Sequence, residues 1–189
     1  MPSHYVALLH ADMQFRDGRV GTTSVTSLDV HDIARSCATY GVKGYFIATP
    51  LVDQQKIVQT LLGFWGDQDA GVAYNKDRSQ ALETVAVMND LDSIIAAIEA
   101  KEGKKPLLIG TSAKTVATVP AITFFDQGRV WEANRPVLFL FGTGNGMSEA
   151  LLKRCDYMLP PIKSFVDFNH LSVRSAAAIV LDRWLGISS

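Results

Sequence analysis

The sequence is poor in the residues that form covalent or metal cross-links. Its two cysteines, Cys37 and Cys155, lie far apart, so we expect buried free thiols rather than a disulfide. The four histidines are dispersed, and the spacings CxxC and HExxH do not occur. No metal site is therefore predicted.

Long apolar runs are also missing. No stretch approaches the roughly 18 apolar residues that a membrane-spanning helix needs. The segment Met1–Asp12 lacks the basic region and cleavage site of a signal peptide, so we expect a cytoplasmic protein without a membrane segment. Apolar residues make up 48% of the 189 residues, which is ample for a core, and the length predicts a single domain over residues 1–189.

No charge of one sign predominates, because the formal net charge is −1. Affinity for nucleic acid rests largely on neutralised phosphates, so a nucleic-acid surface on this chain must be a local patch. A dimer would bring two such patches together. The available basic groups are Arg16, Arg19, Arg35, Lys43, Lys101, Lys104 and Lys105.

Strand and helix patterns alternate along the chain, which predicts an α/β fold with a mostly parallel sheet and helices on both faces. Strands are expected at His4–His10, Gly44–Thr49, Thr84–Met88, Pro106–Gly110 and Pro136–Phe141. Helices are expected from Thr26 to about Tyr40, over Leu51–Phe64 with Ile57, Val58, Leu61 and Leu62 inward, and from Asp90 or Asp92 to Glu102. The stretch Trp65–Ser79 has little pattern and is interpreted as a mobile, substrate-facing loop, whereas Pro120–Ala133 fits either a helix or a hairpin.

The densest set of signals lies between Pro136 and Trp184. A buried strand ends in the glycine loop GTGNG at residues 142–146, and a short helix follows. Glycines between a strand and a helix let backbone N–H groups approach a ligand. The paired prolines of Tyr157–Ile162 predict a loop, and Asn169 or Ser172 would cap a closing helix over Val173–Leu185.

The glycine loop also allows a dinucleotide-binding interpretation. Its spacing is GxGxG rather than GxGxxG, and the next apolar run ends in prolines where a ribose-binding acid would be needed. These departures disfavour a dinucleotide site.

In this order, the segments FGTGNGM, LPPI and FNHLSVRSAAAIVLD resemble the second and third motifs of SPOUT-class RNA methyltransferases. The resemblance implies an α/β knot, in which the C-terminal segment forms a trefoil knot and S-adenosylmethionine lies in the knotted pocket. It assigns cofactor binding to Phe141, Gly142, Thr143, Gly144, Asn145, Gly146, Leu159, Pro161, Ile162, Asn169, His170, Leu171 and Ser172, with Thr111 and Ser112 as second-rank contacts.

The N-terminal half adds a match to the first motif. Asp29 stands where SPOUT ribose methyltransferases have Asn, and Arg35 and Tyr40-Gly41 match the motif's arginine and aromatic-glycine pair. Asp29 and Asp32 are equally well explained as residues of a first helical turn. The segments SLDVHDIAR and TYGVKGYFIATP, with His10, resemble a small bacterial SPOUT subfamily sometimes fused to a tRNA guanine-N1 methyltransferase.

The resemblance implies the catalytic candidates. Arg35 is expected to position the acceptor and stabilise charge, because a guanidinium is too weakly acidic to serve as a base near neutral pH. His31 or His10 would be the easier proton acceptor, although a single histidine is more often structural.

The resemblance therefore predicts S-adenosylmethionine-dependent RNA methylation by a homodimer, with tRNA as the substrate and the ribose 2′-oxygen as the acceptor. Two alternatives stay open: methylation of a base nitrogen, as in the guanine-N1 branch, and a non-catalytic module that binds the cofactor and RNA beside another enzyme. No metal or membrane partner is expected.

Overall fold

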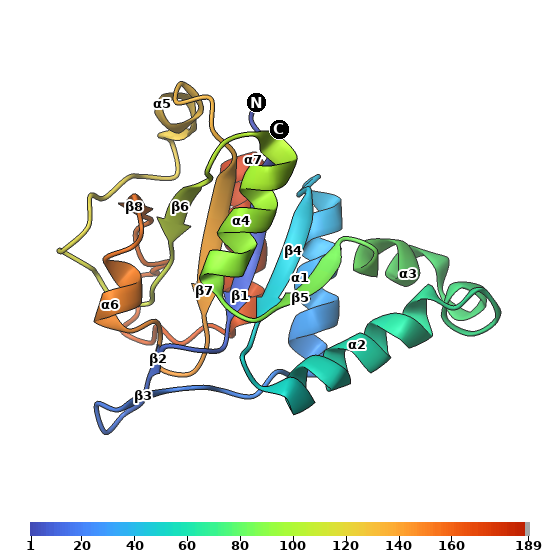
Figure 1. Cartoon of the computed structure of the whole chain (residues 1–189). Coiled ribbons are helices and arrows are strands. Elements are labelled where there is room, and N and C mark those ends of the chain that lie inside the picture. Colours follow the sequence, from blue (N-terminus) through green and yellow to red (C-terminus); the bar gives the residue numbers. More distant parts are fainter. Residues whose placement is uncertain (188–189) are drawn as a thin grey trace.

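The computed structural model describes residues 1–187, and a six-stranded sheet forms its centre (Figure 1). The strand order is β5-β4-β1-β7-β6-β8, and every neighbouring pair is parallel, as the sequence predicts. The strands are β1 (His4–Leu9), β4 (Gly44–Ala48), β5 (Val85–Met88), β6 (Leu107–Gly110), β7 (Val137–Gly142) and β8 (Tyr157–Met158). The antiparallel pair of β2 (Met13–Gln14) and β3 (Val20–Gly21) forms a small separate hairpin.

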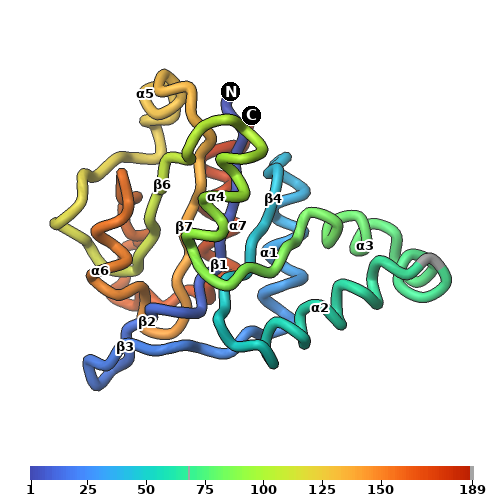
Figure 2. Tube along the Cα trace, viewed as in Figure 1, coloured from blue at the N-terminus to red at the C-terminus, as the bar shows by residue number. Residues whose placement is uncertain are grey.

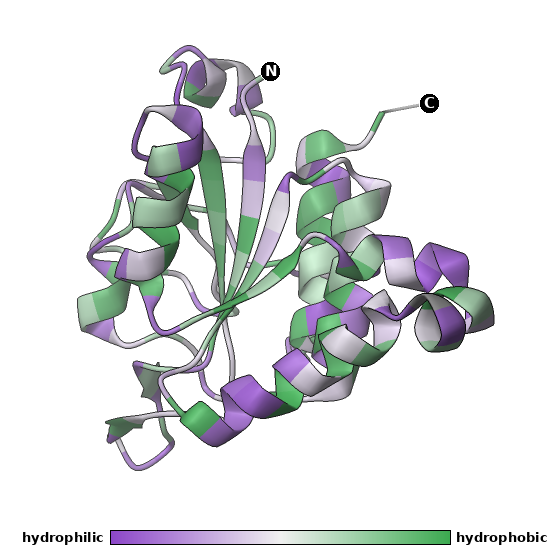
Figure 3. Cartoon of the chain, turned by 45° about the vertical axis from the view of Figure 1, so that its right-hand side comes forward, coloured by the Kyte–Doolittle hydropathy of each residue, from purple (hydrophilic) through white to green (hydrophobic). Residues whose placement is uncertain are grey.

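Helices cover both faces of this sheet (Figure 1). They are α1 (Ser27–Thr39), α2 (Val52–Gly66), the π-helix η1 (Gln68–Val72), α3 (Lys76–Leu82), α4 (Leu91–Glu102), α5 (Gln127–Trp131), α6 (Glu149–Leu152) and α7 (Val173–Leu185). One core layer lies beneath α1 and α7, and the other lies beneath α4 and α6. Hydrophobic residues run along the strands between these layers, while much of the outer helical surface is hydrophilic (Figure 3).

Local sequence explains the principal helices. Thr26 caps α1 by accepting a hydrogen bond from the Asp29 amide. The apolar residues Val30, Ile33, Ala34 and Cys37, at helical spacing, form its buried face. Asp90 caps α4 in the same way, and Gly103 ends that helix with φ +73°. Both predicted helices are confirmed.

Because β1 lies at the centre of the sheet, the loops that follow β1 and its neighbours lie close together at one edge of the sheet. β1 pairs with β4 on one side and with β7 on the other. The chain therefore leaves β1 and β7 at the same edge of the sheet, where the β2–β3 hairpin also lies (Figure 2). Ligands of open parallel sheets bind at such a change of strand order.

The stretch Trp65–Ser79 is not the loop that was predicted. Its polar residues start two helical segments: Asp67 caps η1 and Asn75 caps α3 through their side-chain oxygens. Trp65 is 8% exposed, and the Ser79 hydroxyl donates to the Trp65 carbonyl at 2.6 Å. The polar residues that suggest a loop are therefore helix caps.

Three further predictions can be compared with the structure. Ile57 does not face inward but is 56% exposed, because the buried stripe of α2 runs through Val58 and Trp65. The ambiguous stretch Pro120–Ala133 is mostly loop with the short helix α5. Cys37 and Cys155 are buried and free, as predicted.

Membrane-spanning helices and metal-binding clusters are both absent from the described residues. No helix within residues 1–187 has the length and apolarity needed to cross a membrane. The same residues contain no group of three or more histidine, cysteine or acidic side chains that could hold a metal ion.

Candidate functional site

A cavity of about 800 Å³ lies at the edge of the sheet where β1, β6 and β7 end. This size is within the usual range for a pocket that encloses a small molecule. The loops after β1, β6, β7 and β8 and the first turns of α7 form its wall.

The cavity gathers the predicted cofactor-binding residues with one exception. Pro161 does not line it, and Pro160 does so instead. The other predicted residues all form part of the wall: Phe141, Gly142, Thr143, Gly144, Asn145, Gly146, Leu159, Ile162, Asn169, His170, Leu171, Ser172, Thr111 and Ser112.

The glycine loop follows β7 directly, and its backbone requires glycine at two positions. Gly144 has φ +58° and Gly146 has φ +105°, a region that side-chain-bearing residues adopt only with strain. A Cβ atom on Gly144 would also lie 3.2 Å from Cγ2 of Thr23. The loop therefore presents main-chain groups to the cavity at close range.

Thr143 anchors this loop to the chain segment that follows β1. Its hydroxyl lies 3.0 Å from the Leu9 carbonyl and 2.5 Å from the Thr23 hydroxyl. The Thr23 hydroxyl in turn lies 3.1 Å from Nδ1 of His10. If Thr143 donates to Leu9, then Thr23 donates to Thr143 and His10 donates from Nδ1, because each hydroxyl has a single proton.

His10 stands at the buried end of this network. It is fully buried, and its Nε2 atom has no hydrogen-bond partner among the residues that the structure describes. Burial lowers the pKa of His10 to about 4, so the ring is neutral near pH 7. His10 does not itself line the cavity, and it is connected to the cavity wall through the Thr23 hydroxyl.

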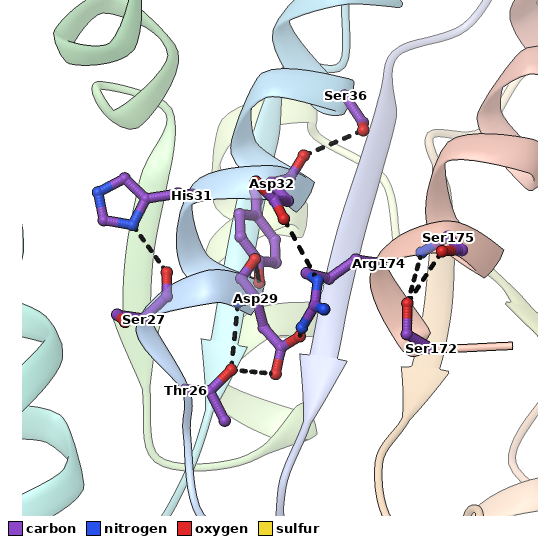
Figure 4. A network of polar contacts seen from close by, with 10 residues as sticks. Thr26, Ser27, Asp29, His31, Asp32, Ser36, Ser172, Arg174 and Ser175 are labelled. Atoms are coloured by element: carbon purple, nitrogen blue, oxygen red, sulfur yellow. Dashed lines mark hydrogen bonds and ion pairs between the residues drawn. The ribbon is translucent and has the colours of Figure 1, made fainter.

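An ionic network joins the start of α1 to the start of α7 (Figure 4). Arg174 lies 3.1 Å from Oδ1 of Asp29 and 3.3 Å from Oδ2 of Asp32. The Thr26 hydroxyl donates to the second oxygen of Asp29 at 2.6 Å. Asp29 is 7% exposed and, among the described residues that line the cavity, is the one with a carboxylate.

The other two catalytic candidates lie on α1 outside the cavity wall. His31 donates from Nδ1 to the Ser27 carbonyl at 2.7 Å, and its ring packs edge-on against Trp65 and away from Arg174 (Figure 4). Arg35 is exposed on the same helix. The structure thus separates Arg35, His31 and His10 from the residues that form the cavity.

The closing loop, which joins β8 to α7 over residues 159–172, is held near its end by two polar contacts. Ser172, rather than Asn169, caps α7, since its hydroxyl accepts from the Ser175 amide at 3.2 Å. Asn169 donates from its amide to the Ala113 carbonyl at 2.8 Å. This bond ties the closing loop to the loop that follows β6.

Sequence reasoning missed several residues of the site. Arg174 carries no pattern that separates it from other exposed arginines of a helix. Thr23, Arg16 and Lys114 line the cavity, which Arg174 does not, and they lie in loops without a motif. The sequence pattern correctly predicts the start of α1 at its N-cap Thr26, but it does not predict the hydrogen bond between the side chains of Thr26 and Asp29.

Residues 3–186 match the sequence profile of a family described as SAM-dependent RNA methyltransferase. The chain is 41% identical over 182 residues to a tRNA (guanine-N(1)-)-methyltransferase of Oleidesulfovibrio alaskensis, which covers 96% of this chain and 42% of that protein. The chain therefore spans less than half the length of that relative. It is also 36% identical to an uncharacterised protein of Aquifex aeolicus, across 95% of this chain and 86% of that one.

A solved structure shares the fold. The SpoU methyltransferase AviRb of Streptomyces viridochromogenes, in complex with its cofactor AdoMet, superposes with a TM-score of 0.58 at 18% identity. The superposition covers 96% of this chain and 56% of that chain. The family match confirms the predicted resemblance to RNA methyltransferases, and the superposition shows that the α/β fold is shared.

Proposed function

The chain belongs to a family of SAM-dependent RNA methyltransferases, and we propose that its cavity holds S-adenosylmethionine and that the protein methylates a tRNA. The observation that carries this proposal is the convergence of the glycine loop, the loop after β8 and the start of α7 on one cavity. α6 and β8 separate the glycine loop from the other two segments, and each of the three contains sequence that resembles the family.

The lining of the cavity fits the proposed cofactor. Leu159, Ile162 and Val173 offer apolar surface to an adenine ring, and Thr111 and Ser112 offer hydroxyls to a ribose. The positive φ angles at Gly144 and Gly146 leave main-chain groups free of side-chain cover. When bound, S-adenosylmethionine supplies a methyl group on a sulfonium, which needs no metal for its transfer.

A guanine base nitrogen is the acceptor that we propose, rather than the ribose oxygen. The Oleidesulfovibrio relative is named a tRNA guanine-N1 methyltransferase, and this chain matches 42% of that protein, which supports this choice. Asp29 gives a second reason, because a carboxylate accepts hydrogen bonds from the N1–H and amino groups on one edge of guanine. In this scheme the carbon–sulfur bond breaks, the carbon–nitrogen bond forms, and the N1 proton passes to water, so the products are the methylated base, S-adenosylhomocysteine and a released proton.

The protein would accelerate methyl transfer mainly by orienting the acceptor relative to the cofactor. Arg174 and Thr26 hold both oxygens of Asp29, so an acceptor bound there would be fixed relative to the glycine loop. Holding two reacting groups in line accounts for a large part of the rate enhancement in such transfers.

Arg35 fits this function if the protein forms a homodimer. The guanidinium lies outside the cavity of its own chain, and we propose that it contacts RNA bound to the partner copy. An Arg35→Ala variant would then lose methyl transfer and retain cofactor binding.

Nucleoside analysis tests the proposed function. The purified protein is incubated with methyl-labelled S-adenosylmethionine and unmodified tRNA, and the RNA is digested to nucleosides. We expect the label in a methylated guanine base. Label in a ribose would favour the 2′-oxygen indicated by the first motif and Arg35. Cofactor binding without label in any RNA would favour the non-catalytic module.

A further inference from the structure

Two cations line the cavity from different loops. Arg16 lies at the tip of the β2–β3 hairpin, and Lys114 lies in the loop after β6. Within the described part of the chain, neither side chain forms an ion pair. Arg19 of the same hairpin differs, because its guanidinium lies 2.7 Å from Asp17 and it does not line the cavity.

The glycine loop holds the base of the hairpin that carries Arg16. The Gln14 amide donates to the Gly146 carbonyl at 2.9 Å, and the Ser148 amide donates to the Asp12 carbonyl at 2.8 Å. The hydroxyls of Thr23 and Thr143 make a third link. Both ends of the hairpin are therefore held against the loop that would bind the cofactor, and its tip lies at the cavity.

Lys114 is held from the other side. Its amide donates to the Ser112 hydroxyl at 3.0 Å, and the preceding Ala113 carbonyl accepts from Asn169 at 2.8 Å. The loop after β6 is thus fixed to the closing loop. Two cations without acidic partners are presented to one cavity by supported backbone.

We propose that Arg16 and Lys114 form an anion subsite at the cavity that binds a phosphate of the RNA substrate. The proposal rests on the proposed function, since it names how the same site holds its acceptor. With a formal net charge of −1, the chain has no general attraction for RNA. Cations beside the reacting groups would supply that attraction at the site itself. The same phosphate contact would also fix the position of the RNA strand relative to the cofactor.

The carboxylate of the cofactor is the competing ligand for these cations. That carboxylate belongs to an amino acid whose ammonium group would need acceptors nearby. Asp29 is the carboxylate of the cavity wall, but the proposed function assigns it to the guanine base. Two cations therefore suit a phosphodiester, with its single negative charge, better than a zwitterion.

Salt dependence of RNA binding provides the test. Affinity for an unmodified tRNA transcript is measured by fluorescence anisotropy from 25 to 200 mM KCl for wild type, Arg16→Gln, Lys114→Gln and the matched control Arg19→Gln. Affinity for S-adenosylhomocysteine is measured in parallel by calorimetry. Each subsite variant should bind the transcript about fivefold more weakly at 0.1 M salt, with a log–log slope smaller by about 1. Arg19→Gln should keep the wild-type slope, and all four proteins should bind S-adenosylhomocysteine equally.

Each other outcome overturns the proposal in a distinct way. Variants that lose S-adenosylhomocysteine affinity but keep the wild-type tRNA slope would assign the cations to the cofactor carboxylate. If the variants match wild type in both measurements and wild type methylates tRNA, the proposed subsite is refuted and the proposed function still stands. Absence of tRNA binding by wild type at 25 mM KCl would contradict both.

Discussion

The hydroxyl oxygens of Thr23 and Thr143 lie 2.5 Å apart, although 120 positions separate the two residues in sequence. One follows β3 and the other begins the glycine loop after β7. The contact couples the cavity wall to the fully buried His10, which lies on the other side of Thr23. The conformation of the glycine loop thus depends on a segment at the opposite end of the chain.

A Thr23→Val substitution tests this coupling. It would leave Nδ1 of the buried His10 without a partner and remove one of the two contacts of the Thr143 hydroxyl, which keeps its bond to Leu9. An unpaired buried polar group costs about 1–3 kcal/mol of unfolding free energy. Urea denaturation of Thr23→Val and Thr22→Val gives the comparison, since no side-chain hydrogen bond involves Thr22 in the described structure. Equal stabilities for the two variants would show that the network contributes nothing.

Arg174 should be coupled more strongly to Asp29 than to Asp32. The side chain of Asp29 is 9% exposed, whereas that of Asp32 is 49% exposed, so solvent screens the second pair. Double-mutant cycles with Arg174→Gln, Asp29→Asn and Asp32→Asn measure both couplings through unfolding free energies. We expect about 1–3 kcal/mol for Asp29 and below about 1 kcal/mol for Asp32. The reverse order would refute the assignment of Asp29 as the buried partner.

Stability should fall as the pH decreases from about 6.5 toward 4. Burial lowers the pKa of His10 and His4 to about 4 in the folded protein. His4 is held neutral by Trp131 and Trp184, whose indole N–H groups both donate to its Nε2. The unfolded chain, with histidine pKa values near 6.5, takes up protons first, so stability is fully present above pH 6.5 and is lost below it.

Each ring should contribute a slope of up to about 1.4 kcal/mol per pH unit in this window. Urea denaturation between pH 7 and 5 measures the slope before most carboxylates titrate. A His10→Gln variant should show roughly half of the wild-type slope. A wild-type stability that stays constant over this range would contradict the neutral, buried state of both rings.

Gly144→Val should abolish cofactor binding because it changes the conformation of the glycine loop itself. The substitution strains a backbone at φ +58° and places atoms against Thr23. Gly103→Val is the matched control, because Gly103 has φ +73° and caps α4 away from the cavity. Both variants should lose about 1–2 kcal/mol of stability, and calorimetry should show loss of S-adenosylhomocysteine binding in Gly144→Val alone. If Gly144→Val bound normally, the glycine loop would not form the cofactor site.

The cavity wall was largely predictable because its signals are local. A strand ending in glycines, paired prolines that stop a strand, and a capped helix each occupy a short segment, and their order resembles a family. Pro160 lines the cavity in place of the predicted Pro161, because the sequence does not determine which of two adjacent prolines faces inward.

The catalytic candidates were less predictable because their surroundings come from distant segments. The burial of His10 depends on β4, β7 and the segment at Thr23, and no single segment indicates it. The ion pair of Arg174 with Asp29 joins residues 145 positions apart. Asp67 and Asn75 were misread for a different reason, because residues that cap helices are also the residues typical of loops.

Calorimetric titration of the purified protein with S-adenosylhomocysteine, with NAD as the control ligand, tests the central claim most directly. We predict binding in the micromolar range with one site per chain and no heat of binding with NAD. Silence with both ligands, or a preference for NAD, would leave the glycine loop without its proposed ligand and would contradict the assignment of the cavity to S-adenosylmethionine.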